Sequence, residues 1–269
     1  MEYEGLYNVS KEMRRLVVDA IYQAQSGHPG GSLSICEILT VLYFKQMNID
    51  EKKPNKENRD RFVLSKGHAA PAYYAALAMR GFFPREDLKT LRKIDSYLQG
   101  HPCRGKIPGV DMSTGSLGQG LSAANGMALY SKTEKKDFYV YCVCGDGELQ
   151  EGQIWEAVMS ASHYKLDNLI LFVDQNKLQI DGRVENVMNV EPIADKFKAF
   201  GWSVYETDGH NIEALDETID KAKKVQGAPS VIVCHTIKGK GVSYMENEVG
   251  WHGAAPNKEQ YLQAMKELI

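Results

Sequence analysis

The fold of this chain is decided by Phe138-Tyr-Val-Tyr-Cys-Val-Cys-Gly-Asp-Gly147, a short apolar run that ends in a carboxylate between two glycines. A second apolar run, at 169–173, is followed by Asn176, and a helical pattern separates the two runs. Apolar runs without alternation are typical of strands that are buried on both faces of a parallel sheet. Ligands bind beyond the carboxyl ends of such strands, so we expect Asp146 and Asn176 to lie close together.

These two side chains predict a site for a hard divalent ion. Carboxylate and amide oxygens suit magnesium, which keeps its remaining positions for water and phosphate oxygens. The glycines on either side of Asp146 let backbone N–H groups approach an anion, and a helix expected from about Gln153 would direct its positive end toward it. A Gly-Asp-Gly tripeptide alone is more typical of a turn. The second ligand at the end of the next strand therefore favours a metal-bound diphosphate.

The same patterns organise the rest of the chain. Strands are expected at 61–64, 138–144, 169–174, 203–205 and 231–235. Helices are expected from 13 to 24 after an N-cap at Ser10, and then at 35–44, from about Pro71, and at 121–130, 154–162, 212–225 and 258–268. Because strands and helices alternate, we expect one α/β domain, 1–269, with a mostly parallel sheet and helices on both faces.

Composition excludes several classes of protein. With 43% hydrophobic and 25% charged residues, the chain of 269 residues is typical of globular proteins. A net charge of −3 argues against nucleic-acid binding, and no apolar run is long enough to span a membrane. The first residues lack the features of a signal peptide, and five cysteines without disulfide-like spacing suit a reducing cytoplasm. The pair Cys142 and Cys144 is interpreted as two small buried side chains of one strand.

Histidines form a second group of candidates. Four of the seven, His28, His68, His101 and His252, lie in loops beside glycine or proline. Imidazole is the side chain best suited to proton transfer near neutral pH, and His68 precedes an expected helix N-terminus, where anions bind. The other three histidines are interpreted as structural. A zinc site is disfavoured because no two histidines have close ligand spacing.

In these motifs the chain resembles the N-terminal, diphosphate-binding portion of transketolase. The matching segments run in order along nearly the whole chain: Ser26-Gly-His-Pro-Gly30, Asn58-Arg-Asp-Arg-Phe-Val-Leu-Ser65 with Gly67-His68, Gly100-His-Pro102, Thr114-Gly-Ser-Leu-Gly-Gln-Gly120, Gly145-Asp-Gly-Glu-Leu-Gln-Glu-Gly152, Asp174-Gln-Asn176 with Ile180-Asp-Gly182, and Trp251-His-Gly253. The resemblance implies the thiamine diphosphate-binding fold of the diphosphate (PP) type, with thiamine diphosphate and Mg²⁺ or Ca²⁺ as cofactors.

The resemblance also implies a role for each matching residue. It gives the metal ligands as the side chains of Asp146 and Asn176 and the backbone carbonyl of Leu178. It gives the other cofactor contacts as His68, Gly147 and His252 at the diphosphate and Gly115, Leu117 and Ile180 at the thiamine rings, with Asn176 touching both metal and cofactor. It gives the catalytic residues as His28, His101 and His252 at the sugar oxygens, and Glu151 in an acidic network between paired active sites.

Two departures from the family pattern matter. Ser116 stands where the family usually has proline, and the chain ends at Ile269, before the pyrimidine-binding and C-terminal domains of the single-chain enzyme. We therefore expect the N-terminal subunit of a split transketolase. With a separate C-terminal subunit, in an α2β2 assembly, it is expected to transfer a two-carbon ketol unit from a ketose phosphate to an aldose phosphate, as in pentose phosphate metabolism.

Three alternatives remain at this point. The first is a related enzyme for another sugar, such as dihydroxyacetone synthase. The second is the α subunit of a 2-oxo acid dehydrogenase, which shares the metal motif but is not expected to carry the loops of His28, His101 and His252. The third is a non-catalytic protein that kept the domain, and broken metal or histidine positions would distinguish it.

Overall fold

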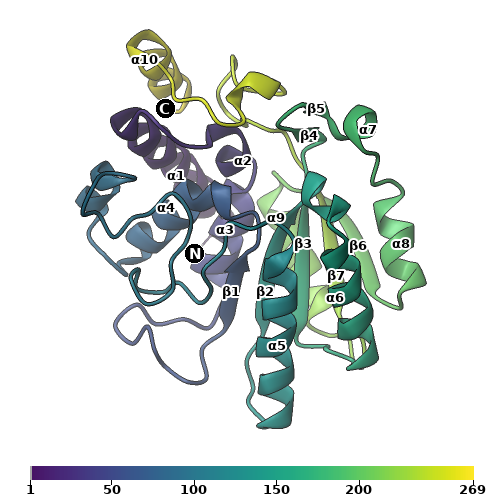
Figure 1. Ribbon diagram of the computed structural model, residues 1–269. Coiled ribbons are helices and arrows are strands. Elements are labelled where there is room, and N and C mark those ends of the chain that lie inside the picture. Colours follow the sequence, from purple (N-terminus) through teal and green to yellow (C-terminus); the bar gives the residue numbers. More distant parts are fainter. Residues whose placement is uncertain (1) are drawn as a thin grey trace.

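The computed structural model describes residues 2–269. Its centre is a five-stranded sheet in which every pairing is parallel, in the order β1-β2-β3-β7-β6 (Figure 1). The strands are β1 (Arg61–Leu64), β2 (Val140–Gly145), β3 (Leu169–Gln175), β6 (Ser203–Asp208) and β7 (Ser230–His235). The predicted parallel α/β sheet is confirmed, and the five predicted strands differ from the observed ones only at their ends.

Strand β2 shows how the sheet divides its side chains between two cores. Tyr141 and Val143 belong to one buried cluster, whereas Cys142 and Cys144 belong to the other. Successive side chains of a strand point to opposite faces, so an apolar strand without alternation needs cover on both sides. Both cysteines are buried, free thiols. Their interpretation as small buried side chains of one strand is confirmed.

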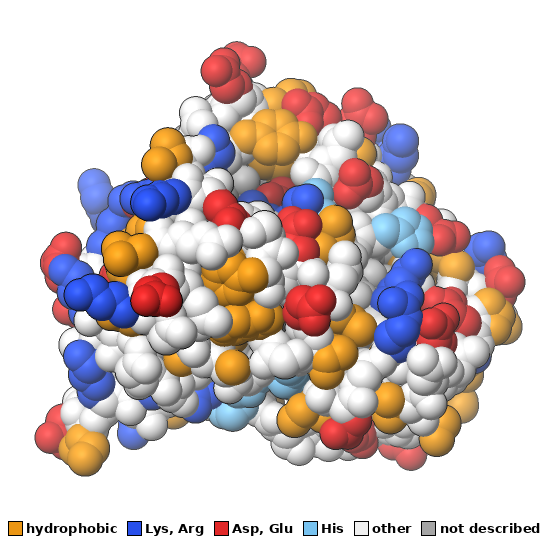
Figure 2. Space-filling model, turned by 90° about the horizontal axis from the view of Figure 1, so that it is seen from above, with side chains coloured by type: hydrophobic (Ala, Val, Ile, Leu, Met, Phe, Trp, Pro, Cys, Tyr) orange, Lys and Arg blue, Asp and Glu red, His pale blue; other side chains and the backbone are white. Residues whose placement is uncertain are grey.

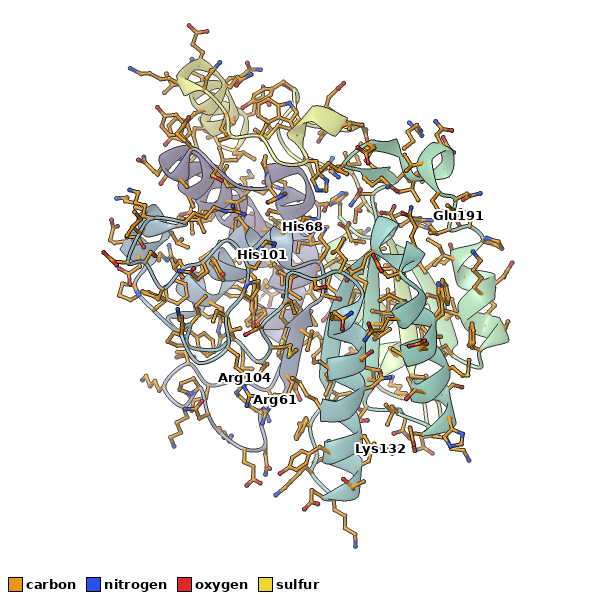
Figure 3. The ribbon with its side chains drawn as sticks, viewed as in Figure 1. Arg61, His68, His101, Arg104, Lys132 and Glu191 are labelled. Atoms are coloured by element: carbon orange, nitrogen blue, oxygen red, sulfur yellow. The ribbon has the colours of Figure 1, made fainter. Side chains whose placement is uncertain are left out.

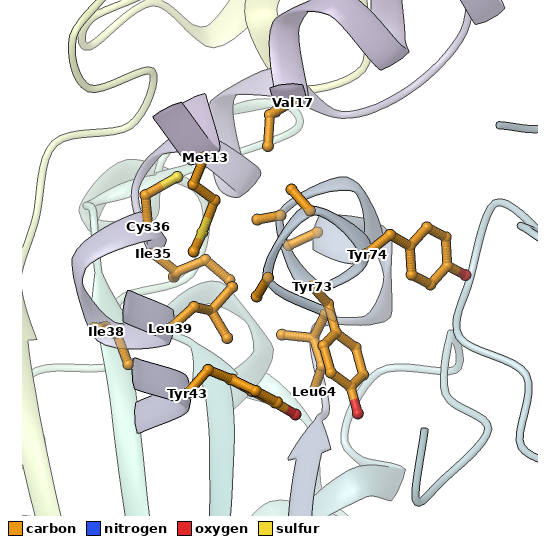
Figure 4. Close-up of a cluster of buried hydrophobic side chains, with 14 of the residues drawn as sticks. Met13, Val17, Ile35, Cys36, Ile38, Leu39, Tyr43, Leu64, Tyr73 and Tyr74 are labelled. Carbon is orange, nitrogen blue, oxygen red and sulfur yellow. The ribbon is translucent and has the colours of Figure 1, made fainter. Parts of the chain in front are cut away.

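The first core lies under the helices on one face of the sheet. These helices are α1 (Tyr3–Ala24), α3 (Cys36–Val41), α4 (Ala70–Arg80) and α9 (Ile212–Ala222). In Figure 4, Met13 of α1, Leu39 of α3 and Tyr73 of α4 approach one another. The Tyr73 ring also packs edge-on against Phe62 of β1, with 4.9 Å between ring centroids. Burial of each such large side chain contributes about 1.5–3 kcal/mol, so this cluster fixes α4 on the sheet.

Helices α5 (Gln119–Thr133), α6 (Gly152–His163) and α8 (Ile193–Ala199) cover the other face (Figure 1). Trp202, just before β6, donates its indole N–H to the Val158 carbonyl of α6 at 2.9 Å. The smaller elements are α2 (Pro29–Leu33), a π-helix (Leu42–Gln46), α7 (Val184–Val187), the hairpin β4 (Leu178–Gln179) and β5 (Gly182–Arg183), and 3₁₀ helices at Gly67–Ala69, Arg85–Thr90, Gly147–Gln150 and Val249–Trp251. Because helices cover both faces, ligands reach the sheet only at its ends.

Two expected helix boundaries near the N-terminus were wrong. Helix α1 begins at Tyr3, and Ser10 lies inside it, with its hydroxyl donating to the Tyr7 carbonyl at 2.9 Å. The helix extends toward the N-terminus because Leu6 also packs into the core. The single helix expected at 35–44 is divided into α3 and the π-helix, which continues it to Gln46.

The C-terminal helix α10 (Lys258–Glu267) packs against α1. Its N-terminus carries a capping box between Asn257 and Gln260, which satisfies backbone N–H groups that the helix leaves free. Tyr261 stacks on Tyr22 of α1 at 4.1 Å between centroids. No helix within residues 2–269 is both long and apolar enough to cross a membrane.

Candidate active site

A cavity of about 280 Å³ opens at the carboxyl ends of β2 and β3. Its lining residues are Gly31, Lys66, His68, Leu117, Gly145, Asp146, Gly147, Glu148, Gln150, Glu151, Asn176, Leu178, Gln179, Ile180, Lys238 and His252. Figure 2 looks down on this end of the molecule and shows lysine, acidic and histidine side chains around a recess. Most of the residues singled out from the sequence therefore share one cavity, which we call the cleft.

Asp146 and Asn176 meet in the cleft as predicted from the strand ends. Gly145 of β2 is paired with Asp174 of β3, so the residues that follow each strand leave the sheet side by side. The Asp146 carboxylate accepts hydrogen bonds from the backbone N–H groups of Gly147 at 2.8 Å and Lys177 at 2.6 Å. Because Lys177 directly follows Asn176, these bonds fix the two predicted ligands next to each other.

The donor set suits a divalent cation. Burial, together with the charge of Asp174, raises the pKa of Asp146 to about 7, and a bound cation would keep this carboxylate ionised. The Asn176 amide is oriented at both ends, donating to Asp174 at 2.8 Å and accepting from the Leu178 N–H at 3.1 Å. Within residues 2–269 no group of three or more His, Cys, Asp or Glu side chains could hold a metal. The predicted set has one carboxylate, one amide and one backbone carbonyl, which is a magnesium- or calcium-type set.

Two buried lysines line the cleft, and neither was expected to have a role there. The Lys66 ammonium lies 2.5 Å from Asp174 and donates to the Gly31 carbonyl at 2.8 Å. The Lys238 ammonium donates to the Leu178 carbonyl at 2.9 Å and lies 2.9 Å from Nδ1 of His252. Burial, with the nearby charge of Lys66, lowers the pKa of Lys238 to about 8. Lys66 is paired with Asp174, whereas Lys238 has no ion pair within residues 2–269, so an anionic ligand would compensate the charge of Lys238.

A sequence signal for these lysines existed in their positions. Lys66 follows β1 and Lys238 follows β7, so both come from carboxyl ends of strands, like Asp146 and Asn176.

Glu148 was also missed. Its buried carboxylate accepts bonds from Ser65 at 2.5 Å, from the Gly118 N–H at 2.9 Å and from the Gly145 N–H at 3.0 Å. It therefore ties together three of the loops that form the cleft.

Three of the four predicted histidines form one cluster. The ring centroids of His28, His68 and His252 are 5.2–5.5 Å apart, and His68 and His252 line the cleft. Burial and then Arg92 lower the pKa of His28 to about 4, and burial and then Lys238 lower the pKa of His252 to about 3. Burial and then Lys66 lower the pKa of His68 well below its ordinary value. All three imidazoles are therefore neutral at pH 7 and can both donate and accept hydrogen bonds.

His101 lies beside this cluster and is exposed. It is labelled with His68 in Figure 3. Its ring is so close to Gly115 that a Cβ there would be 3.0 Å from the ring, which explains why this position needs glycine. Arg92 links it to the cluster, since its guanidinium lies 3.5 Å from Nδ1 of His28 and 3.4 Å from the Gly100 carbonyl. Burial and Arg92 lower the pKa of His101 as well.

The remaining predicted residues lie at the mouth of the cleft or behind it. Leu117 and Ile180 line the cleft with 37% and 64% of their surfaces exposed, and Glu151 lies at the rim. Gly147 lines the cleft. Gly115 does not line it and lies against the His101 ring. The 3₁₀ turn Gly147–Gln150 contributes lining residues, and so does Glu151, the N-cap residue of α6. The start of α6 therefore adjoins the cleft, and the direction of its positive end toward a diphosphate stays a prediction.

Known proteins share this fold and these motifs. The sequence matches the family "Transketolase, thiamine diphosphate binding domain" over residues 7–268. It is 47% identical to a 6-deoxy-6-sulfo-D-fructose transketolase subunit of Clostridium sp. (strain MSTE9), covering 98% of this chain and 96% of that protein. It is 44% identical to one of the subunits of an apulose-4-phosphate transketolase of Phocaeicola vulgatus, covering 100% of this chain and 95% of that protein.

Single-chain transketolases match over a part of their length. Human transketolase is 41% identical over 98% of this chain and 42% of its own. The transketolase structure from Leishmania mexicana superposes with a TM-score of 0.93 at 34% identity, over 98% of this chain and 41% of that one. Fold and cleft thus define a thiamine diphosphate-binding α/β domain. The chain belongs to the transketolase family, and the relatives that it matches along nearly their whole length are subunits of split transketolases.

Proposed function

We propose that this chain works with a separate C-terminal subunit as a transketolase that moves a two-carbon ketol unit from a ketose phosphate to an aldose phosphate. The observation that carries the proposal is the cleft. A carboxylate and an amide that suit a cation, two buried ammonium groups and two neutral histidines converge there, and His28 packs against both histidines. The near-complete coverage of two split-transketolase subunits supports the division between chains.

The chain's own residues can hold the cofactor in the cleft. Asp146, Asn176 and the Leu178 carbonyl would bind Mg²⁺ or Ca²⁺, for which the oxygen set is suited. His68, His252 and the backbone at Gly147 would contact the diphosphate, with the ammonium groups of Lys66 and Lys238 balancing its charge. The apolar side chains of Leu117 and Ile180, with Gly115 behind them, would pack against the thiamine rings.

The histidines would handle protons at the substrate oxygens. When bound, thiamine diphosphate supplies the nucleophilic carbon that accepts the ketol unit. Burial keeps both His28 and His252 neutral. The Lys238 ammonium donates to Nδ1 of His252, so His252 would donate its Nε2–H to an oxygen that gains charge. His28 would donate one N–H and accept a proton at its other nitrogen. His101 would do the same from the loop that also carries Gly115. Glu151 at the rim would face the neighbouring active site in an α2β2 assembly.

The names of the relatives bear on the substrate. One is a transketolase subunit for 6-deoxy-6-sulfo-D-fructose and another is for apulose 4-phosphate, so substrates within this group differ. A sulfonated or branched sugar is therefore a second candidate beside the pentose phosphates. The cleft described here holds the cofactor end of the site, so we place the recognition of the sugar's distal anionic group on the C-terminal subunit.

The decisive experiment reconstitutes the complex. The chain is purified with its C-terminal subunit, and ketol transfer to ribose 5-phosphate is measured from xylulose 5-phosphate, from 6-deoxy-6-sulfo-D-fructose and from apulose 4-phosphate. Activity is expected only with both chains, thiamine diphosphate and Mg²⁺. Transfer by this chain alone, or none from any donor in the full mixture, would refute the proposal.

A further inference from the structure

A second hollow lies far from the cleft, at the amino end of β1. It has a volume of about 530 Å³ and is lined by Pro54, Asn55, Arg59, Arg61, Arg104, Gly105, Lys106, Ile107, Pro108, Gly109, Val110 and Asp111. We call it the basic groove, because four cationic side chains line it with one carboxylate. Figure 3 shows Arg61 and Arg104 next to each other at this end of the molecule, away from His68. Its volume lies within the range of roughly 300–1,000 Å³ that is typical of small-molecule sites.

Arg61 is held in place without a carboxylate of its own. Its Nη1 and Nη2 groups donate to the main-chain carbonyls of Arg59, Asp60 and Glu57, the last at 2.9 Å. Its guanidinium also lies over the ring of Phe138, 4.7 Å from the centroid. Of the five N–H donors of an arginine, Nε–H and one Nη2–H have no acceptor within hydrogen-bond distance in residues 2–269. A fixed guanidinium with free donors is prepared for an oxyanion.

Asp111, the one carboxylate in the groove, is already engaged. Its two oxygens accept bonds from Arg59 at 2.5 and 3.0 Å and from the Phe62 N–H at 3.0 Å. Arg61 Nε lies 3.9 Å from it, beyond hydrogen-bond distance. Two guanidinium groups thus share one carboxylate. Burial and the charge of Arg59 lower the pKa of Arg61, and the charges of Asp111 and Asp60 offset only part of this.

The loop on the far side of the groove adds two more cations. Arg104 and Lys106 are exposed, and neither side chain has an ion pair or hydrogen bond in the part of the chain that the structure describes. Gly105 between them has a positive φ of 85° and open space where a side chain would lie. The loop therefore leaves room for a ligand beside both cations. The groove as a whole carries four positive charges against one negative charge.

An apolar hollow of about 400 Å³ continues the basic groove along α5. It shares Arg61, Arg104 and Asp111 with the groove, and its other lining residues are Ala123, Gly126, Met127, Tyr130 and Phe138. Tyr130 is 48% exposed, and no heavy atom lies within 4 Å of a Cβ built at Gly126. A cationic half and an aromatic half therefore adjoin. This combination suits a ligand that has a phosphate at one end and a flat ring at the other.

We propose that the basic groove and its apolar continuation bind a nucleoside phosphate or a phosphate ester of similar shape. Arg61, Arg104 and Lys106 bind the phosphate, and the ring lies against Tyr130 and Met127. The segment Cys103–Asp111 lies between His101 and Gly115 in the chain, so an occupant of the groove contacts the segment that joins these two residues. This proposal does not depend on the transketolase reaction.

The test measures binding of adenosine monophosphate to the full chain by calorimetry. The affinity of the wild type is compared with that of the double variant Arg104→Ala/Lys106→Ala, whose side chains are exposed and without partners. We expect the double variant to lose about tenfold or more in affinity, because two charge-assisted contacts are removed. Inorganic phosphate and adenosine are each expected to bind the wild type more weakly than the monophosphate.

Two further variants distinguish binding in the basic groove from binding at other lysines of the protein. Lys238→Met changes the cleft, and Lys224→Ala removes an exposed lysine beyond the end of α9. Both are expected to bind adenosine monophosphate like the wild type. No saturable binding at about 1 mM, or binding that Lys238→Met weakens and the groove variant does not, would overturn the site. Equal affinities for inorganic phosphate and the monophosphate would overturn the role of the apolar half.

Discussion

The two ends of the sheet both bury cations beside a carboxylate, but they use them differently. At the carboxyl end, Lys66 pairs with Asp174, and both touch groups that line the cleft. At the amino end, Arg59 pairs with Asp111, which also accepts the Phe62 N–H of β1 and so joins a distant loop to the sheet. The first pair therefore shapes a binding site, whereas the second holds the fold together.

The effect of a buried charge in this fold depends on what its partners contact. A buried ion pair is costly to form and more costly to break, because one partner is then left uncompensated in a poorly solvated place. Lys66 lines the cleft, so its removal should change cofactor affinity. Arg59 and Asp111 also line the basic groove, but Asp111 holds the Phe62 N–H of β1, so its removal should first change stability. Each prediction below tests one side of this comparison.

The largest effect is expected from Asp146→Ala at the carboxyl end. The variant should lose detectable binding of metal and thiamine diphosphate in the assembled complex, because the only carboxylate predicted to bind the metal is removed. Calorimetry checks this. Asp208→Ala is the matched control, since Asp208 also ends a strand on this side but is exposed and outside the cleft. Undiminished affinity in Asp146→Ala would refute the metal site.

A large effect confined to turnover is expected from His101→Ala. His101 lies beside the cleft without lining it, so its loss should lower kcat by about 10²–10⁴-fold and change cofactor affinity much less. Steady-state kinetics and cofactor titration of the assembled complex separate the two effects. His163→Ala, an exposed histidine at the end of α6, is the control. An unchanged turnover number would remove His101 from the reaction.

Much of the cleft could be predicted because it depends on short-range patterns. Unalternating strands imply a parallel sheet, and the residues after each strand must then meet at one edge. For that reason Asp146 and Asn176 could be placed together from the sequence alone. The histidines His28, His68 and His252 could be singled out by their loops beside glycine or proline, but only the resemblance indicated that their three loops converge.

What could not be predicted depends on distant contacts. The positions of Lys66 and Lys238 after strand ends place them near the cleft, but their burial depends on Asp174 and the Leu178 carbonyl, which accept their hydrogen bonds. The hairpin Leu178–Arg183 is too short to show any periodicity. Helix α1 starts early because Leu6 finds space in the core, which local capping rules cannot reveal.

At the amino end, the expected effect of Asp111→Asn is on stability. Removing the charge leaves Arg59 buried without its partner, so we expect the free energy of unfolding to fall by about 3–5 kcal/mol. Urea denaturation of the isolated chain measures it. Asp167→Asn breaks a partly exposed pair with Lys132 and should cost less than about 1 kcal/mol. Equal losses in the two variants would erase the distinction between the buried pair and the exposed one.

The smallest effect is a pH dependence that arises in the cleft's histidine cluster. His28 faces Arg92, His101 and Lys238, and its pKa is about 4 when folded, against an ordinary 6.5. Between these pH values the unfolded chain binds a proton that the folded chain does not, so the free energy of unfolding falls as pH decreases from 6.5 to 4. Above pH 6.5 this contribution is constant.

The variant His28→Gln removes that contribution, so its stability should decrease less than that of the wild type between about pH 7 and about pH 5. Urea denaturation at both pH values gives the comparison, and the difference between the two proteins cancels the titration of the carboxylates that they share. Parallel losses of stability in both proteins would mean that His28 has the same pKa in the folded and the unfolded chain. Burial would then not be what keeps His28 neutral in the cluster.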